Sequence, residues 1–410
     1  MTGRLPLNRD ARLLIAGQGL RAAGYGFTAV LLGALLAARG YGHLRAGVVL
    51  TALIAGTALS SLLAGAVADR IGRRRCYGVF FLAIAAAGAI VAAGAPFWVL
   101  LAVALTGTLS TDVVDNGPAT TLEQVMLAGD DAGTAHVYGR YNAAGAACGA
   151  LGALAVALPG VHTGGNGTAV HAWLFAVLIP VGLGGAVLAS RLSPAVEAAD
   201  RERGHGLGAS RPVVRRMAAL FAMDAGGGGL VTTGFLAYFF TQRFGASTVT
   251  LGWLFFTVAI IQTLSVLLAP VLARRFGLVP TMVGTHLPSN LLLAAIAFAP
   301  TLPVAVGLLL ARTTLSQMDV PTRQALVMTV VSPAERTAAA AYTNAARYSV
   351  RPVGPLLAGA AQQITLGAPL LLAGLIKGSY DLLLWRWARH VTLPTKQTVI
   401  TTVALPGEPA

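Results

Sequence analysis

The residues of this sequence that could carry chemistry are charged side chains inside long apolar stretches. A charge in the hydrocarbon of a membrane is costly unless it is paired or hydrated, so each one needs a partner, water or a function. Groups of this kind carry protons or bind charged solutes. In the first half of the chain they are Arg21, Asp112 and Asp115, with Glu123 at the edge of its stretch; in the second half they are Asp224, Arg312, Asp319, Arg347, Arg351, Lys377 and Asp381.

Arg21 and Asp224 occupy equivalent positions, because the two halves of the chain repeat each other at an offset of about 203 residues. Asp224 is followed by the glycines of 226–229, which weaken a helix and leave backbone groups free for a ligand. We hypothesise that Asp224 is a protonation site and that Arg21 is its partner or an anchor for an anionic solute. The alternative is that each of them forms a static interhelical salt bridge or lies near a water-filled vestibule.

A second proton site is the hypothesis for Asp112, Asp115 and Asp319, which fall in the fourth and tenth apolar stretches. Asp319 has a simpler alternative, since Arg323 lies four residues further on and one helical turn brings the two together.

Three side chains of the eleventh stretch, Asn344, Arg347 and Arg351, form another candidate group. The two arginines share one helix face, and paired guanidiniums suit a carboxylate or phosphate. They could equally neutralise the acidic residues of neighbouring helices. Lys377 and Asp381, again four apart, are expected to form an ion pair within one helix.

His286 lies inside the ninth apolar stretch and is a further candidate for chemistry. A histidine in this setting can relay protons. A hydrogen-bonded structural role is the favoured alternative, and a lone histidine is no metal site.

Apolar stretches long enough to cross a bilayer must position these groups, and there are about six in each half. They are approximately 13–37, 46–68, 76–94, 97–121, 135–158 and 171–190, then 217–240, 249–272, 280–299, 302–322, 337–361 and 368–389. The pattern predicts an all-α integral membrane protein with twelve transmembrane helices in two six-helix bundles related by a pseudo-two-fold axis. We expect bundles at 1–190 and 217–390, a polar linker at 191–216 and a tail at 391–410.

The composition supports a membrane protein, since 56% of the residues are apolar, 11% are charged and the mean hydropathy is +0.72. The formal charge of +14 comes from basic residues scattered between apolar blocks, which argues against a nucleic-acid surface. Most arginines near the ends of the stretches fall on the side of both termini and the linker, whereas Arg39, Arg45 and Arg243 fall on the other. The positive-inside rule therefore predicts that both termini and the linker are cytoplasmic.

The segment that begins at Gly65 reads GAVADRIGRRR, between the second and third stretches. It resembles the loop signature of the major facilitator superfamily, which has Gly-x-x-x-Asp-Arg-x-Gly followed by basic residues. The matching residues are Gly65, Asp69, Arg70, Gly72, Arg73, Arg74 and Arg75. The resemblance implies the two-bundle fold and alternating access. The arginine and Gly-Pro motifs that are usual in drug exporters of this superfamily are absent from the fourth and fifth stretches.

The resemblance and the intramembrane acids together predict a secondary active transporter that exports a small organic compound with proton coupling. The alternative is a transporter of an anionic metabolite, for uptake or exchange, that uses the intramembrane arginines. We expect no enzyme, because no Ser-His-Asp, HExxH or His/Cys cluster is visible. The further expectations are no metal or cofactor beyond a proton gradient, a small-molecule substrate, no nucleic acid, and a monomer in the bacterial cytoplasmic membrane.

Overall fold

The structure is a computed structural model that describes residues 8–110, 117–127, 134–158, 171–197, 207–332 and 335–389, and these residues form helices and no strands. The first half contains α1 (Arg9–Ala38), α2 (His43–Ile71), α3 (Arg73–Ala92), α4 (Phe97–Leu105), α5 (Pro118–Leu127), α6 (Thr134–Ala155), the 3-10 helix η1 (Ala172–Val177), α8 (Leu178–Ser190) and the 3-10 helix η2 (Pro194–Glu197). The second half contains α9 (Arg211–Gly229), α10 (Thr233–Phe244), α11 (Thr248–Phe276), α12 (Leu278–Ile296), α13 (Leu302–Ser316), α14 (Asp319–Val330), α15 (Arg336–Val350), α16 (Val353–Ala361) and α17 (Ala368–Ala388).

The helices follow the predicted apolar stretches, and several stretches are divided in two. The seventh breaks between α9 and α10 just after the glycines of 226–229, where Thr232 caps the new helix by accepting from the Phe235 amide at 3.2 Å. The tenth breaks between α13 and α14, and the eleventh between α15 and α16 at Pro352. Seven spans in the described part of the chain are long and apolar enough to cross a membrane.

The repeat of the two halves is visible at the turns that follow α2 and α11. Gly72 and Gly277 stand at equivalent places, and both have φ of 94°, a left-handed conformation that favours glycine. Each glycine ends one long helix and begins the next, α3 in the first half and α12 in the second. The predicted duplication is therefore present in the backbone as well as in the sequence.

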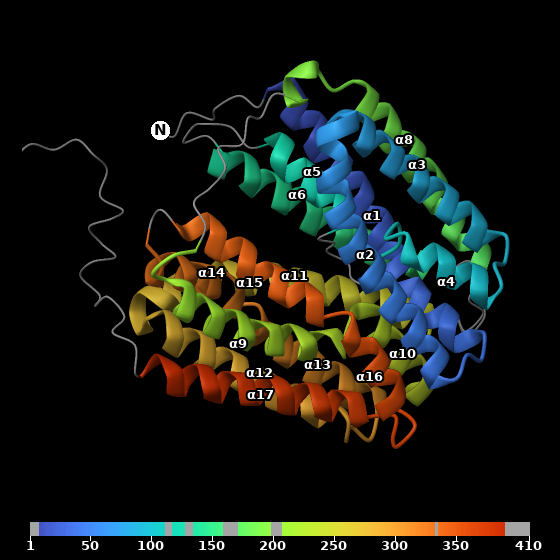
Figure 1. The fold of residues 1–410 in the computed structure, drawn as a ribbon. Helices are drawn as coiled ribbons and strands as arrows, with labels where there is room; N and C mark the ends of the chain where they lie inside the picture. The colour runs from blue at the N-terminus through green and yellow to red at the C-terminus, as the bar shows by residue number, and fades with distance from the viewer. Residues whose placement is uncertain are drawn as a thin grey trace, which may run out of the picture.

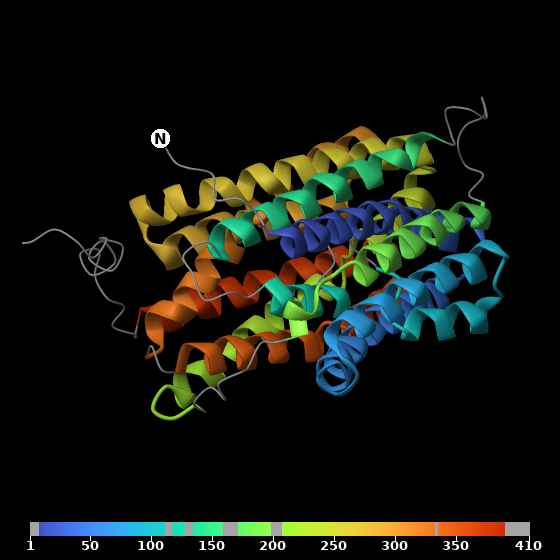
Figure 2. The ribbon, with the colours of Figure 1, turned by 90° about the horizontal axis from the view of Figure 1, so that it is seen from above.

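The two halves form separate helical bodies that diverge toward one end of the molecule (Figure 1). In the view turned by 90°, the helices of both halves run along the same general direction (Figure 2). Helix α1 packs against α10, α2 against α16, and α6 against α11, and these are the main contacts between the halves. Close approach relies on glycine, since a Cβ atom at Gly47 would lie 2.6 Å from the Pro355 carbonyl oxygen and 3.0 Å from the Gly359 Cα.

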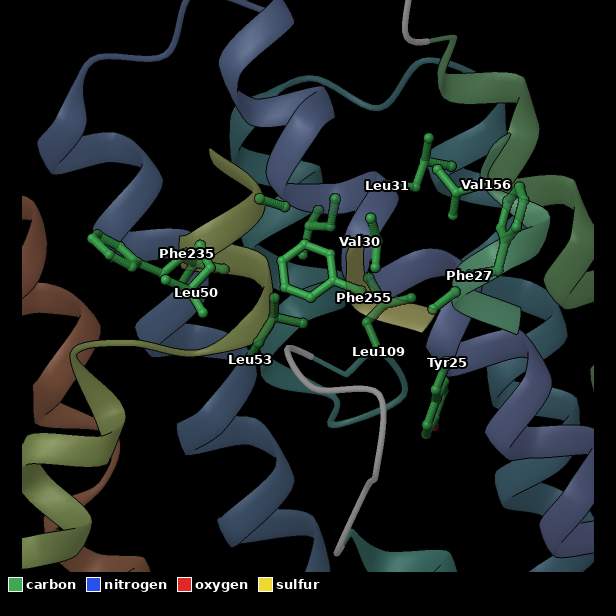
Figure 3. Close-up of a cluster of buried hydrophobic side chains, with 14 of the residues drawn as sticks. Tyr25, Phe27, Val30, Leu31, Leu50, Leu53, Leu109, Val156, Phe235 and Phe255 are labelled. Atoms are coloured by element: carbon green, nitrogen blue, oxygen red, sulfur yellow. The ribbon is translucent and has the colours of Figure 1, made fainter. Parts of the chain in front are cut away.

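A buried apolar cluster runs through the first half and crosses to the second half at the end opposite the central linker. Figure 3 shows members of this cluster from both halves. Its members shown there come from α1 and α2, from α10 and α11, and from the segments that follow α4 and α6: Tyr25, Phe27, Val30, Leu31, Leu50, Leu53, Leu109, Val156, Phe235 and Phe255. Burial of this apolar area holds that end closed.

At the linker end, the second half has an apolar cluster of its own. It includes Val214, Phe221, Val283, Leu326 and Leu384, and its members all come from the second half. Helix α5 packs mainly on α1, α2 and α3, whereas α14 packs mainly on α11, α12 and α15. The described residues therefore give a molecule that is closed at one end, with its halves packed separately at the linker end.

Candidate functional site

The first half buries an ion pair between α1 and α5. The Arg21 Nη2 atom lies 2.6 Å from the Glu123 Oε2 atom, and the two side chains are 1% and 0% exposed. Arg21 also donates to the Thr120 Oγ1 atom at 3.0 Å and to the Gln18 Oε1 atom. Glu123, which the sequence placed at the edge of its apolar stretch, is therefore buried between helices and is the main partner of Arg21.

Two tyrosines complete the shell around Glu123. The Tyr77 hydroxyl of α3 donates to the Oε1 atom and the Tyr141 hydroxyl of α6 donates to the Oε2 atom, each at 2.5 Å. Both rings are 1% exposed. Each carboxylate oxygen thus has a donor, which is the condition under which a charge can be buried at modest cost.

The second half buries a larger network around Asp224 of α9. The Lys377 Nζ atom of α17 donates to its Oδ1 atom, and the Arg323 Nη1 atom of α14 lies 3.4 Å from its Oδ2 atom. The same Arg323 atom lies 2.6 Å from the Asp319 Oδ2 atom, so the pairing one turn apart that the sequence suggested is present. The predicted pairing of Arg21 with Asp224 is wrong, because each of them pairs within its own half.

His286 of α12 connects two carboxylates of this network. Its Nδ1 atom lies 2.8 Å from the Asp381 Oδ1 atom and its Nε2 atom lies 3.7 Å from the Asp224 Oδ1 atom. The Asn290 Nδ2 atom donates to the other Asp381 oxygen at 2.9 Å. The predicted ion pair between Lys377 and Asp381 is wrong, since Lys377 reaches Asp224 and Asp381 reaches His286.

Two guanidiniums of the second half have a buried Nε atom without an acceptor, those of Arg312 and Arg347. Neither forms an ion pair or a side-chain hydrogen bond with the described residues. Arg347 of α15 lies close enough to Asp224, Asp319 and Arg323 to interact with them electrostatically, whereas Arg312 of α13 has no such charged neighbour among them.

The remaining predicted site residues are less closely connected. Asn344 is exposed on α15, and Arg351 lies half-buried at the break between α15 and α16. Asp112 and Asp115 fall outside the described residues, as does the tail from 390 onward. The repeat also relates two partners of these residues. Thr120, which contacts Arg21, occupies the position equivalent to Arg323, which contacts Asp224, so the repeat could have indicated both contacts.

The start of the linker contacts the loop that carries the superfamily signature. A carboxylate in η2, that of Glu197, accepts from the backbone amides of Arg73 and Arg74 at 2.6 and 3.1 Å and so caps α3. The Arg74 side chain donates to the Leu192 carbonyl oxygen at 2.9 Å. Arg70 is exposed, Gly65 and Asp69 lie in the last turns of α2, and the Asp69 side chain is outside the described atoms.

Glu335 makes a similar contact at the other end of the linker. Its Oε2 atom accepts from the Ser210 backbone amide at 3.1 Å. Hydrogen bonding by Ser210 holds the pKa of the Glu335 carboxyl below its usual value. A carboxylate thus attaches each end of the linker to one half of the protein. Glu197 of the linker bonds to the first half, and Glu335 of the second half bonds to the linker.

Comparison with known proteins agrees with this architecture. Residues 14–355 match the family described as the Major Facilitator Superfamily. The chain is 25% identical over 397 residues to the uncharacterized membrane protein YJR124C of Saccharomyces cerevisiae, a match that covers 86% of this chain and 88% of that protein. The crystal structure of the nucleoside transporter NupG is similar over 94% of this chain and 100% of that one, with a TM-score of 0.72 and 16% identity.

The inward open conformation of the xylose transporter XylE from E. coli is also similar, with a TM-score of 0.68, 16% identity, and 95% and 99% of the two chains covered. Identities this low carry information on the fold and not on the solute. The family match covers most of the chain, and the all-helical, two-bundle architecture fits alternating access. The chain therefore belongs to the Major Facilitator Superfamily, whose members are transporters and not enzymes.

Proposed function

We propose that this chain is a proton-coupled secondary transporter of a small organic compound. The observation that supports the proposal is the buried position of His286 between the carboxylates of Asp381 and Asp224. Imidazole is the side chain that gains and loses a proton near neutral pH. Here one ring nitrogen is within hydrogen-bond distance of a carboxylate, and the other lies 3.7 Å from a second one.

The charge balance of this network points to one exchangeable proton. The network holds three carboxylates: those of Asp224 and Asp319 contact the cations Lys377 and Arg323, and that of Asp381 contacts His286. A proton on His286 balances the third carboxylate, and its loss leaves one negative charge in excess. Asp224, the protonation site expected from the sequence, enters this proposal as one member of the unit, which it shares with His286 and Asp381.

The proposed orientation places the linker and both termini in the cytoplasm, on the strength of the arginine distribution. With that orientation the form described above is inward-facing, because its closed end lies opposite the linker. The bacterial inner membrane and the monomeric state stay predictions.

Export of the compound in exchange for protons is the direction expected from the sequence. Movement of solute and proton in the same direction is the alternative. The sign of proton movement during solute transport separates the two, since exchange takes protons in as solute leaves.

The test uses proteoliposomes that hold a pH dye and are offered a panel of neutral, cationic and anionic compounds. We compare wild type with His286→Gln, Asp224→Asn and the control His171→Gln, which changes an exposed histidine. We expect His286→Gln to lose solute-dependent proton movement while it retains exchange of labelled for unlabelled solute, as the control retains both. Full proton-driven accumulation in both His286→Gln and Asp224→Asn would show that this unit does not carry the coupling proton.

A further inference from the structure

Arg347 carries a half-buried positive charge that stands outside the ion pairs around Asp224. Its Nε atom is buried without an acceptor in the described part of the chain, and Arg323, Asp224 and Asp319 lie close enough to act on it electrostatically. Both of these carboxylates already have a cation in direct contact. A guanidinium left without an anion in such a place is costly, so an anion at some step of the cycle would stabilise it.

We infer that Arg347 binds a negatively charged group of the transported compound, a carboxylate or a phosphate. The inference rests on the proposed transport function and names the class of its substrate. A guanidinium presents a planar array of donors that matches either group through two parallel hydrogen bonds.

The surface beside Arg347 gives such a group a route. Asn344 and Tyr348 are exposed on the same helix, within one turn of Arg347.

Protonation of His286 controls whether Arg347 is available. When His286 is neutral, the three carboxylates exceed Lys377 and Arg323 by one charge, and Arg347 compensates that charge from nearby. When His286 is protonated, the network is balanced without Arg347, whose charge is then free for the solute. Proton and anion therefore favour each other's binding, which predicts that they move in the same direction rather than in exchange.

The first experiment measures binding with the full chain in detergent, where no gradient exists. Thermal unfolding is recorded with benzoate or phenyl phosphate, and with the neutral benzamide or phenol as matched probes. The variants are Arg347→Gln and, as a control, Arg243→Gln, which removes an exposed arginine in the last turn of α10.

We expect at least one anion to stabilise wild type and Arg243→Gln more than its neutral probe does, and more strongly at pH 6 than at pH 8. Arg347→Gln should lower the affinity for that anion on the order of 10- to 100-fold, which is the loss expected for a charge-assisted hydrogen bond. Whichever of the two anions binds more tightly shows whether the group is a carboxylate or a phosphate. Absence of an anion preference in wild type, or the same preference in Arg347→Gln, overturns the inference.

A second measurement needs neither a ligand nor a folded Arg347 variant. Asn344→Cys, made with Cys76 and Cys148 replaced by serine, reports the potential one turn from Arg347. We expect an anionic methanethiosulfonate to react faster than a cationic one of similar size, and equal rates or faster cationic reaction would count against a free positive charge. Both measurements are made without a gradient and so do not depend on proton coupling. Anion binding by Arg347 can therefore be refuted while coupling through His286 is supported, and coupling can be refuted while anion binding is supported.

Discussion

Addition of one methyl group at Gly47 should open the closed end of the protein. In Gly47→Ala the new Cβ atom would lie 2.6 Å from the Pro355 carbonyl oxygen and 3.0 Å from the Gly359 Cα. Both neighbours are backbone atoms of α16, so neither can rotate away. The two helices must separate at the point where the halves meet.

The size of the effect follows from the cost of overpacking a close helix contact, about 1–3 kcal/mol. This contact exists only while the end opposite the linker is closed, so the whole cost falls on that state. A penalty of this size changes the ratio of open to closed molecules by about 5- to 150-fold. Gly42→Ala is the matched control, since Gly42 lies just before the same helix and a Cβ atom there meets nothing within 4 Å.

Thiol accessibility from the side of the closed end measures this ratio. Leu53 is 1% exposed in the apolar cluster of Figure 3, so Leu53→Cys should react slowly in an otherwise cysteine-free chain. We expect Gly47→Ala to speed its labelling several-fold or more, whereas Gly42→Ala leaves the rate as it was. Equal rates in the two variants would refute the idea that close packing of α2 on α16 holds this end shut.

Two further predictions concern contacts that are independent of the solute. Glu123→Gln leaves Arg21 buried without its anion, which should destabilise the protein by about 3–5 kcal/mol. Thermal unfolding in detergent measures this loss, and replacement of both residues by methionine should restore much of it. Glu335 has a lowered pKa in the folded protein, so its contact with Ser210 is present above the usual carboxyl pKa and is lost as the pH falls through the lowered value. Hydrogen exchange at the Ser210 amide should therefore be slower than in Glu335→Ala at neutral pH, and the two rates should converge in acid; a constant ratio would contradict this.

Helix positions and turns were predictable from the sequence because a membrane permits few arrangements of the backbone. Every polar backbone group in the hydrocarbon must be satisfied within its own segment, so apolar stretches of spanning length become helices. Glycine marked the breaks and turns in the same local way, after 226–229 and at Gly72 and Gly277. The family resemblance of the loop at Gly65 rested on local sequence too, and the match over 14–355 confirms it.

Charge pairing across helices was not predictable from one sequence. Spacing identifies partners that are one helical turn apart, and it did so for Asp319 and Arg323. The same rule failed for Lys377 and Asp381, because each of them found a closer partner on another helix.

The sequence by itself determined the membrane-embedded helices, the duplicated halves, the signature loop and the identity of the charged residues that needed an explanation. The tertiary structure alone decided which of those charges are neutralised. Arg21 and Asp224 look like partners in the repeat, yet each is neutralised within its own half, by Glu123 in one case and by Lys377 and Arg323 in the other. Composition and spacing describe one helix at a time, whereas the free energy of a buried charge depends on atoms within a few ångströms, which come from helices far apart in the chain.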